Sequence, residues 1–238
     1  MAAKAPRSAA GPAVEPATGF PGIGPGAIRF FEGIAANNDR AWFLAHKADY
    51  EADVLAPLRA LVAAVSNRLQ AAGVPLVGDP LRAVFRINRD VRFSGDKRPY
   101  RTESGAVLSR DGEKSGSGVL HILVGARGGF SACGFYHPGP TELHALRTAV
   151  AARPETFAAA MDGIELAADD TLTRMPRGFE SYVDEPFASV LRLKSIVAVA
   201  PLSTRQLAGP DAVDVIAGHA IACRRLLDFG WSAVLGAT

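Results

Sequence analysis

Apolar positions recur at helical spacing at both ends of the chain and alternate with polar positions in its middle. Ile28, Phe31 and Ile34 form one stripe, which predicts a short helix over 27–36. An amphipathic segment then runs to about residue 72, where Gly73 ends it, and Pro57 either kinks this helix or opens a second one. Further helices are predicted from residue 140, from residue 154 and over 211–229.

Strand-like runs occupy the centre of the sequence. Residues 118–124 and 129–136 flank a glycine-containing connection of the hairpin type, and 195–200 is a compact apolar strand candidate. Residues 84–93 and 102–109 are expected to form a further hairpin with a long, charged connection. The order of elements predicts an α+β fold with a mostly antiparallel central sheet, flanked by N- and C-terminal helices.

The first 26 residues differ from the rest in composition. They are rich in Ala, Pro and Gly and have little to bury, so a disordered tail over 1–26 is expected. Prolines and Glu15 interrupt any signal-peptide core, whereas an organellar transit peptide stays an open alternative. The whole chain of 238 residues is 48% hydrophobic, and no linker is evident after residue 27. A single domain is therefore predicted over 27–238.

The segment 82–101 concentrates the polar chemistry of the chain. It holds seven basic and two acidic side chains, hence +5, and the remainder sums to about −3 of the formal net charge of +2. In an extended strand Arg86, Asn88, Asp90 and Arg92 share one face, while Arg89 interrupts the apolar opposite face. A buried charge of this kind needs a partner, so Arg89 is predicted to be paired with a carboxylate.

Several motifs resemble those of an uncharacterised family, the domain-of-unknown-function 2461 family. The resemblance rests on the run from Arg86 to Arg101, on Phe30-Phe31 with Asn37-Asn38-Asp39-Arg40-Ala41-Trp42-Phe43, on Gly134-Phe135-Tyr136-His137-Pro138 with Leu143 and Arg147, and on 172–179. It covers the chain from about residue 28 to the C-terminus. The family has no established activity, so the resemblance implies a shared site around these motifs without naming a reaction.

Candidate catalytic groups are few. Asp90, held ionised by flanking arginines, is a candidate general base and Tyr100 a candidate proton donor, although a structural Arg–Asp pair is the alternative for Asp90 and for Asp96. The five histidines are scattered without ligand spacing, so no metal is predicted. No cofactor is predicted, because the glycines at 19–26 follow no strand and Gly112-Glu113-Lys114-Ser115 lacks the phosphate-loop pattern.

Three functions remain open from the sequence. The first is binding of a small phosphorylated or anionic ligand at a cleft lined by the arginine-rich hairpin. The second is an enzyme acting on such a ligand, and the third is a nucleic-acid-binding domain, which the negative remainder of the chain weakens. The predicted ligand-binding residues are Arg86, Asn88, Arg89, Arg92, Asp96, Lys97, Arg101, Asn37, Asn38 and Trp42.

Composition also bears on the compartment. Cys133 and Cys223 have neither CxxC spacing nor disulfide density, so they are expected to be free thiols in a reducing, cytoplasmic environment. No apolar run approaches 18 residues, so no transmembrane helix is expected. For the segment 82–101, the alternative to the three functions above is a purely structural one, in which its charged side chains form ion pairs on a solvent-exposed hairpin.

Overall fold

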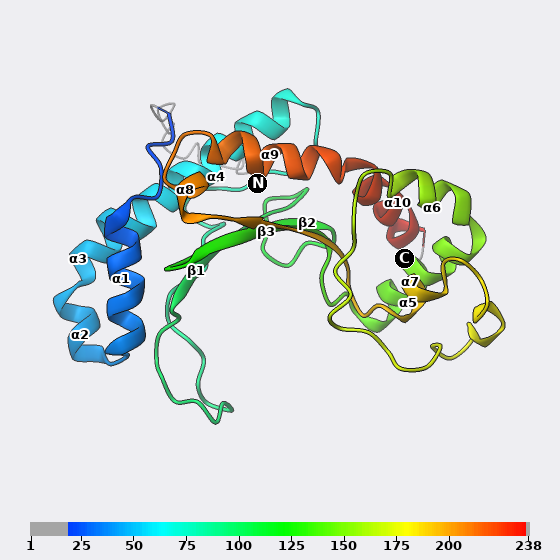
Figure 1. The fold of residues 1–238 in the computed structure, drawn as a ribbon, viewed down its shortest axis with the longest axis horizontal. Coiled ribbons are helices and arrows are strands. Elements are labelled where there is room, and N and C mark those ends of the chain that lie inside the picture. The colour runs from blue at the N-terminus through cyan, green and yellow to red at the C-terminus, as the bar shows by residue number, and fades with distance from the viewer. Residues whose placement is uncertain (1–18, 237–238) are drawn as a thin grey trace, which may run out of the picture.

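The chain forms a four-stranded sheet, with helices before its first strand, between its last two strands and after its last strand (Figure 1). A computed structural model describes residues 19–236. The N-terminal elements are α1 (Pro25–Ala36), α2 (Arg40–Ala45), α3 (Lys47–Asp49), the π-helical η1 (Tyr50–Leu55) and α4 (Ala56–Ala71). The central elements are β1 (Glu103–Leu108), β2 (Val119–Gly125), β3 (Gly128–Phe135), α5 (Pro140–Ala152) and α6 (Pro154–Ala160). The C-terminal ones are η2 (Glu180–Tyr182), α7 (Ala188–Arg192), β4 (Ile196–Leu202), α8 (Thr204–Leu207), α9 (Ala212–Ala222) and α10 (Arg224–Leu235).

The sheet is fully antiparallel, in the order β1-β2-β3-β4, and confirms the predicted α+β class. Its register aligns Leu108, Leu120, Cys133 and Ala198 across all four strands, and all four are buried. Because side chains alternate along a strand, this row and its neighbours form the face directed at the core. Helices α4, α8 and α9 lie on that side of the sheet (Figure 1).

The opposite face of the sheet carries no helix of the described chain (Figure 1). The register aligns Val107, His121, Ala132 and Val199 on this face. On one flank lie α1–α3 and the segment 82–101, and on the other lie α5–α7 (Figure 1). The sheet is therefore covered on one side only, which antiparallel sheets tolerate.

Local sequence signals set the N-terminal helices. Asn37 caps the C-terminus of α1, and Asp39 accepts a hydrogen bond from the Trp42 backbone N–H at the start of α2. Pro57 lies at the start of α4, directly after the π-helical turn η1. Leu55 and Ala56 keep right-handed helical backbone angles, so residues 47–71 form one continuous helical segment rather than two separate helices. The π-helical turn, in which the Ala56 N–H bonds the Glu51 carbonyl, directly precedes the proline.

Two boundaries differ from the sequence-based expectation. Phe20 and Ile23 are buried in the core and α1 begins at Pro25, so the ordered domain starts before the expected boundary at residue 26. Residues 1–18 of the expected tail lie outside the described residues. The predicted single helix over 211–229 is two helices, α9 and α10, which meet at Cys223, where ψ of −1° departs from the regular helical value.

The predicted strand over 84–93 is wrong, whereas its partner over 102–109 is confirmed as β1. The first segment contacts β1 and the residues before it through isolated bridges at Val84–Ala106 and Asn88–Tyr100. Lysine side chains replace part of a regular ladder: Lys114 Nζ donates to the Val84 carbonyl at 2.7 Å and Lys97 Nζ to the Val91 carbonyl at 3.1 Å. The predicted apolar face also does not extend to Phe93, which is 95% exposed.

Candidate functional site

The segment 82–101, called the arginine ribbon below, folds back on itself beside β1. Between its two bridges, the three residues 85–87 face the five residues 101–105, so the pairing slips by two residues. Backbone hydrogen bonds close the ribbon on both sides of this slip, from Phe85 N to Gly105 O at 2.8 Å and from Arg101 N to Ile87 O at 2.8 Å. The unequal lengths create a bulge, a device that often re-aims side chains next to binding sites.

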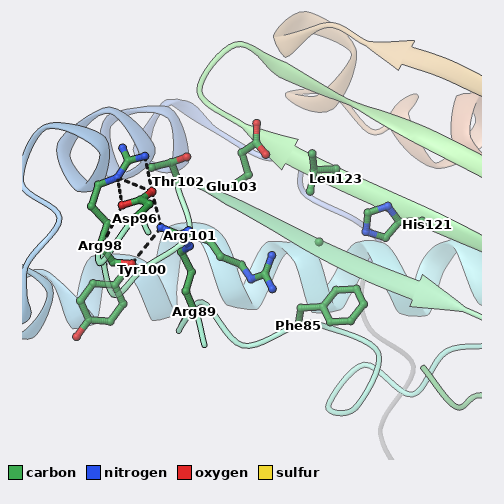
Figure 2. A pocket seen from close by; sticks show the side chains of 11 residues that line it. Phe85, Arg89, Asp96, Arg98, Tyr100, Arg101, Thr102, Glu103, His121 and Leu123 are labelled. Atoms are coloured by element: carbon green, nitrogen blue, oxygen red, sulfur yellow. Dashed lines mark hydrogen bonds and ion pairs between the residues drawn. The ribbon is translucent and has the colours of Figure 1, made fainter. Parts of the chain in front are cut away.

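A pocket of about 420 Å³ opens at this bulge (Figure 2). Its walls come from the arginine ribbon, from the start of β1 and from β2. The lining residues are Phe85, Arg89, Asp96, Arg98, Tyr100, Arg101, Thr102, Glu103, Gly105, His121 and Leu123. Three guanidinium groups and two carboxylates therefore surround it, which leaves a net charge of +1 when His121 is neutral.

Asp96 holds two of the three arginines. Its carboxylate accepts hydrogen bonds from Arg89 Nη1 at 2.8 Å and from Arg98 Nη2 at 2.7 Å, as the dashed lines in Figure 2 show. The bonds from Arg98, followed by those from Arg89, hold the pKa of Asp96 far below its ordinary value. The prediction of a carboxylate partner for Arg89 is confirmed, although its side chain is 27% exposed rather than fully buried.

Arg101 differs from these two arginines. Its guanidinium makes no hydrogen bond or ion pair with any side chain in residues 19–236, although its backbone N–H is bonded within the ribbon. Figure 2 shows the side chain extending along the pocket toward Phe85 and His121. The bulge thus presents to the pocket one guanidinium without a side-chain partner, and the Glu103 carboxylate lines the same pocket.

His121 reaches the pocket from β2. Its ring contacts Phe85 edge-on at 5.9 Å between centroids and Phe130 at 5.7 Å. Burial lowers the pKa of His121 below its ordinary value, and the nearby charge of Arg101 lowers it further. Sequence reasoning considered this residue only as a scattered metal-ligand candidate. Its place in the alternation of β2, between Val119 and Leu123, marks it as a polar residue on the otherwise apolar open face.

Asn38 and Tyr100 join the N-terminal helices to the ribbon. The Asn38 side-chain amide donates to the Tyr100 carbonyl at 3.1 Å, and its oxygen accepts from the Tyr100 N–H at 3.0 Å. The Tyr100 ring is buried and stacks on Phe43 with centroids 4.4 Å apart, and its hydroxyl points away from Arg101 (Figure 2). Asn38 therefore fixes the backbone directly before Arg101 without lining the pocket itself.

Two other predicted residues of the N-terminal motif also lie outside the pocket. Asn37 donates from its side chain to the Gly33 carbonyl at 3.1 Å and so closes the end of α1. The Trp42 indole lies against Gly33 and stacks on His46 with ring centroids 4.0 Å apart. Both residues shape the helical corner that carries Asn38.

The rest of the predicted set occupies the outer surface of the ribbon. Arg86, Asn88, Arg92 and Lys97 are exposed and are not among the residues that line this pocket. Asp90 accepts two hydrogen bonds from the Arg92 guanidinium, at 2.7 and 3.0 Å, and one from the Arg92 backbone N–H at 3.2 Å. These hydrogen bonds lower the pKa of Asp90 below its ordinary value. The structure thus groups Arg89, Asp96, Tyr100 and Arg101 in the pocket and separates them from the alternate face.

In residues 19–236, no cluster of three or more His, Cys, Asp or Glu side chains is arranged to hold a metal ion. The helices described in this range are all too short or too polar to cross a bilayer. Both cysteines are free and buried.

Fold and site together define an α+β domain with a one-sided antiparallel sheet and a basic ribbon beside the sheet's edge. Over residues 26–229 the sequence matches the family described as "Conserved hypothetical protein (DUF2461)", and the chain belongs to that family. No curated protein and no solved structure matches the chain.

Proposed function

We propose that the pocket at the bulge of the arginine ribbon binds a small anionic ligand through a phosphate or carboxylate group. The observation that carries this proposal is the Arg101 guanidinium, which extends into the pocket without a partner among the described side chains. A planar guanidinium offers two parallel N–H donors that match a phosphate or carboxylate. A volume of about 420 Å³ lies within the range of small-molecule sites.

Asp96 supports the same function indirectly. By bonding Arg89 and Arg98 together it fixes two guanidinium groups in place, so that little side-chain entropy is lost when a ligand arrives. Asp96 also neutralises much of the charge of Arg89 and Arg98, which leaves Arg101 as the principal side chain for binding the anion. Asp90 lies outside the pocket and is engaged by Arg92, so the proposal is one of binding and assigns no turnover to Asp90.

One observation favours nucleic acid as a second candidate. Phe93 is 95% exposed, and the Arg92 guanidinium lies 5.8 Å from its ring centroid. An exposed aromatic ring among cations is the arrangement on which single-stranded bases stack. This surface lies on the ribbon, apart from the pocket residues, so the two candidates depend on different side chains.

A thermal-shift experiment separates them. Inorganic phosphate, pyrophosphate and a short oligothymidylate are tested at low and high salt on the wild type, Arg101→Ala and the control Arg86→Ala, which alters an exposed ribbon arginine outside the pocket. A ligand at 100 times its Kd adds about 2.7 kcal/mol, which raises the Tm by several degrees.

We expect phosphate or pyrophosphate to stabilise the wild type and Arg86→Ala but not Arg101→Ala. Absence of any anion effect, or an equal effect in Arg101→Ala, contradicts the proposal. Stabilisation only by the oligonucleotide, with a steep salt dependence and loss in Phe93→Ala, identifies the ribbon as a nucleic-acid surface instead.

A further inference from the structure

The open face of the sheet forms a groove of about 760 Å³. Strand register places three rows of side chains on this face: Val107, His121, Ala132 and Val199; Gly105, Leu123, Phe130 and Pro201; and Val119, Gly134 and Val197. His121 is the single polar side chain in these rows. Solvent-facing sides of antiparallel sheets are normally polar, so this composition is typical of a face that contacts something apolar.

The groove is continuous with the anion pocket. Phe85 and His121 line both, and Phe130 and His121 contact each other across the floor of the groove. Figure 2 shows Arg101 at the junction, extending toward these two shared residues. A ligand whose anionic group binds Arg101 would therefore meet an apolar surface with its remaining atoms.

Side chains of opposite charge lie at the two ends of the groove. At the end near Phe85, Lys114 Nζ lies 5.0 Å from the Phe85 ring centroid. At the other end stand Asp169 and Asp170, the latter bound to Lys194 at 2.6 Å. An anionic group is attracted to Lys114 at the first end and repelled by Asp169 at the second, where Lys194 compensates the charge of Asp170. The two orientations of an amphipathic anion are therefore not equivalent.

We propose that the ligand is an amphipathic anion, whose phosphate or carboxylate binds Arg101 while an aromatic or short aliphatic body covers the open face of the sheet. This inference rests on the proposed function and specifies its ligand class. The body lies over Ala132 and Val199, where small and exposed side chains leave room; Val199 is 45% exposed.

Isothermal titration with a graded ligand series tests it. The ligands are inorganic phosphate, methyl phosphate, butyl phosphate, phenyl phosphate, butyrate and hexanoate, and butanol serves as an uncharged probe. The proteins are the wild type, Arg101→Ala, Val199→Asn and the matched control Val183→Asn, an exposed valine outside the groove. Circular dichroism and Tm confirm that each variant is folded.

Each methylene buried on the sheet adds about 0.8 kcal/mol, or roughly a fourfold gain in affinity. We expect butyl and phenyl phosphate to bind at least ~10-fold more tightly than methyl phosphate. Val199→Asn should remove most of this gain, Val183→Asn none of it, and Arg101→Ala should abolish binding of the whole anionic series. The phosphate and carboxylate arms identify the preferred anionic group.

The outcomes distinguish the two proposals. If inorganic and methyl phosphate bind through Arg101 and larger bodies add no affinity, the anion site stands and the amphipathic ligand is refuted. A gain that survives Val199→Asn unchanged refutes the placement on the sheet. If butanol binds as well as butyl phosphate, or if no anion of the series binds, both proposals fail.

Discussion

The Asn38 amide is the contact through which the helical N-terminal motif positions the pocket. Its two hydrogen bonds, at 3.0 and 3.1 Å, satisfy both backbone groups of Tyr100, the residue before Arg101. Asn38→Ala removes both bonds and leaves a partly buried N–H and carbonyl without protein partners. Each such bond contributes about 0.5–1.5 kcal/mol net, so the free energy of unfolding should fall by about 1–3 kcal/mol.

For a chain of this length a loss of 1 kcal/mol lowers the Tm by roughly 2–4 °C, so a loss of about 2 kcal/mol corresponds to about 4–8 °C. Urea unfolding followed by circular dichroism measures the free energy directly. The neighbouring Asn37→Ala is the matched control: it removes one exposed hydrogen bond to Gly33 and should cost only about 0.5 kcal/mol. Asn38→Asp retains the acceptor for the Tyr100 N–H and places a charge against the Tyr100 carbonyl, so it should also destabilise.

A second readout separates positioning from general stability. Because Asn38 fixes the backbone before Arg101, Asn38→Ala should weaken the phosphate-dependent thermal shift, whereas Asn37→Ala should leave it unchanged. Equal unfolding free energies for Asn38→Ala and Asn37→Ala would refute the reasoning. So would a destabilised Asn38→Ala that retains the full effect of the anion, because the clamp would then not position Arg101.

Three further outcomes are expected. Gly230→Ala places a Cβ against the Phe135 ring and should cost about 1–3 kcal/mol in urea unfolding, whereas Gly218→Ala, in open space on α9, should stabilise by up to ~1 kcal/mol. Phe20→Ala should cost about 3–5 kcal/mol, and a neutral result would exclude Phe20 from the core. Because the pKa of His121 is lowered in the folded protein, its contribution to stability is fully present above the unfolded pKa of 6.5 and is lost as the pH falls toward the folded pKa. The free energy of unfolding, measured by urea titration from pH 7 to 5, should therefore depend less on pH in His121→Asn than in the wild type. Parallel curves for the two proteins would contradict this.

Much of the fold follows from local sequence alone. The caps at Asn37 and Asp39 and the β2–β3 hairpin were all predictable, because each depends on residues within a few positions of one another. The same holds for the charge of the arginine ribbon and for the pairing of Arg89. The family assignment also rests on sequence, since it depends on motifs rather than on contacts.

The pocket was decided by tertiary structure. Alternation along 84–93 correctly predicts that Ile87 is buried between exposed neighbours. It also predicts that Arg86 and Arg92 line a cleft, but neither residue lines the pocket. The two-residue slip between the ribbon and β1 turns Arg101 toward His121, which lies 20 residues further along the chain. Alternation fixes which residues share a face within one strand. The register between the arginine ribbon and β1 also depends on the bulge between them and on how both segments pack against the sheet and its helices, which alternation alone does not determine.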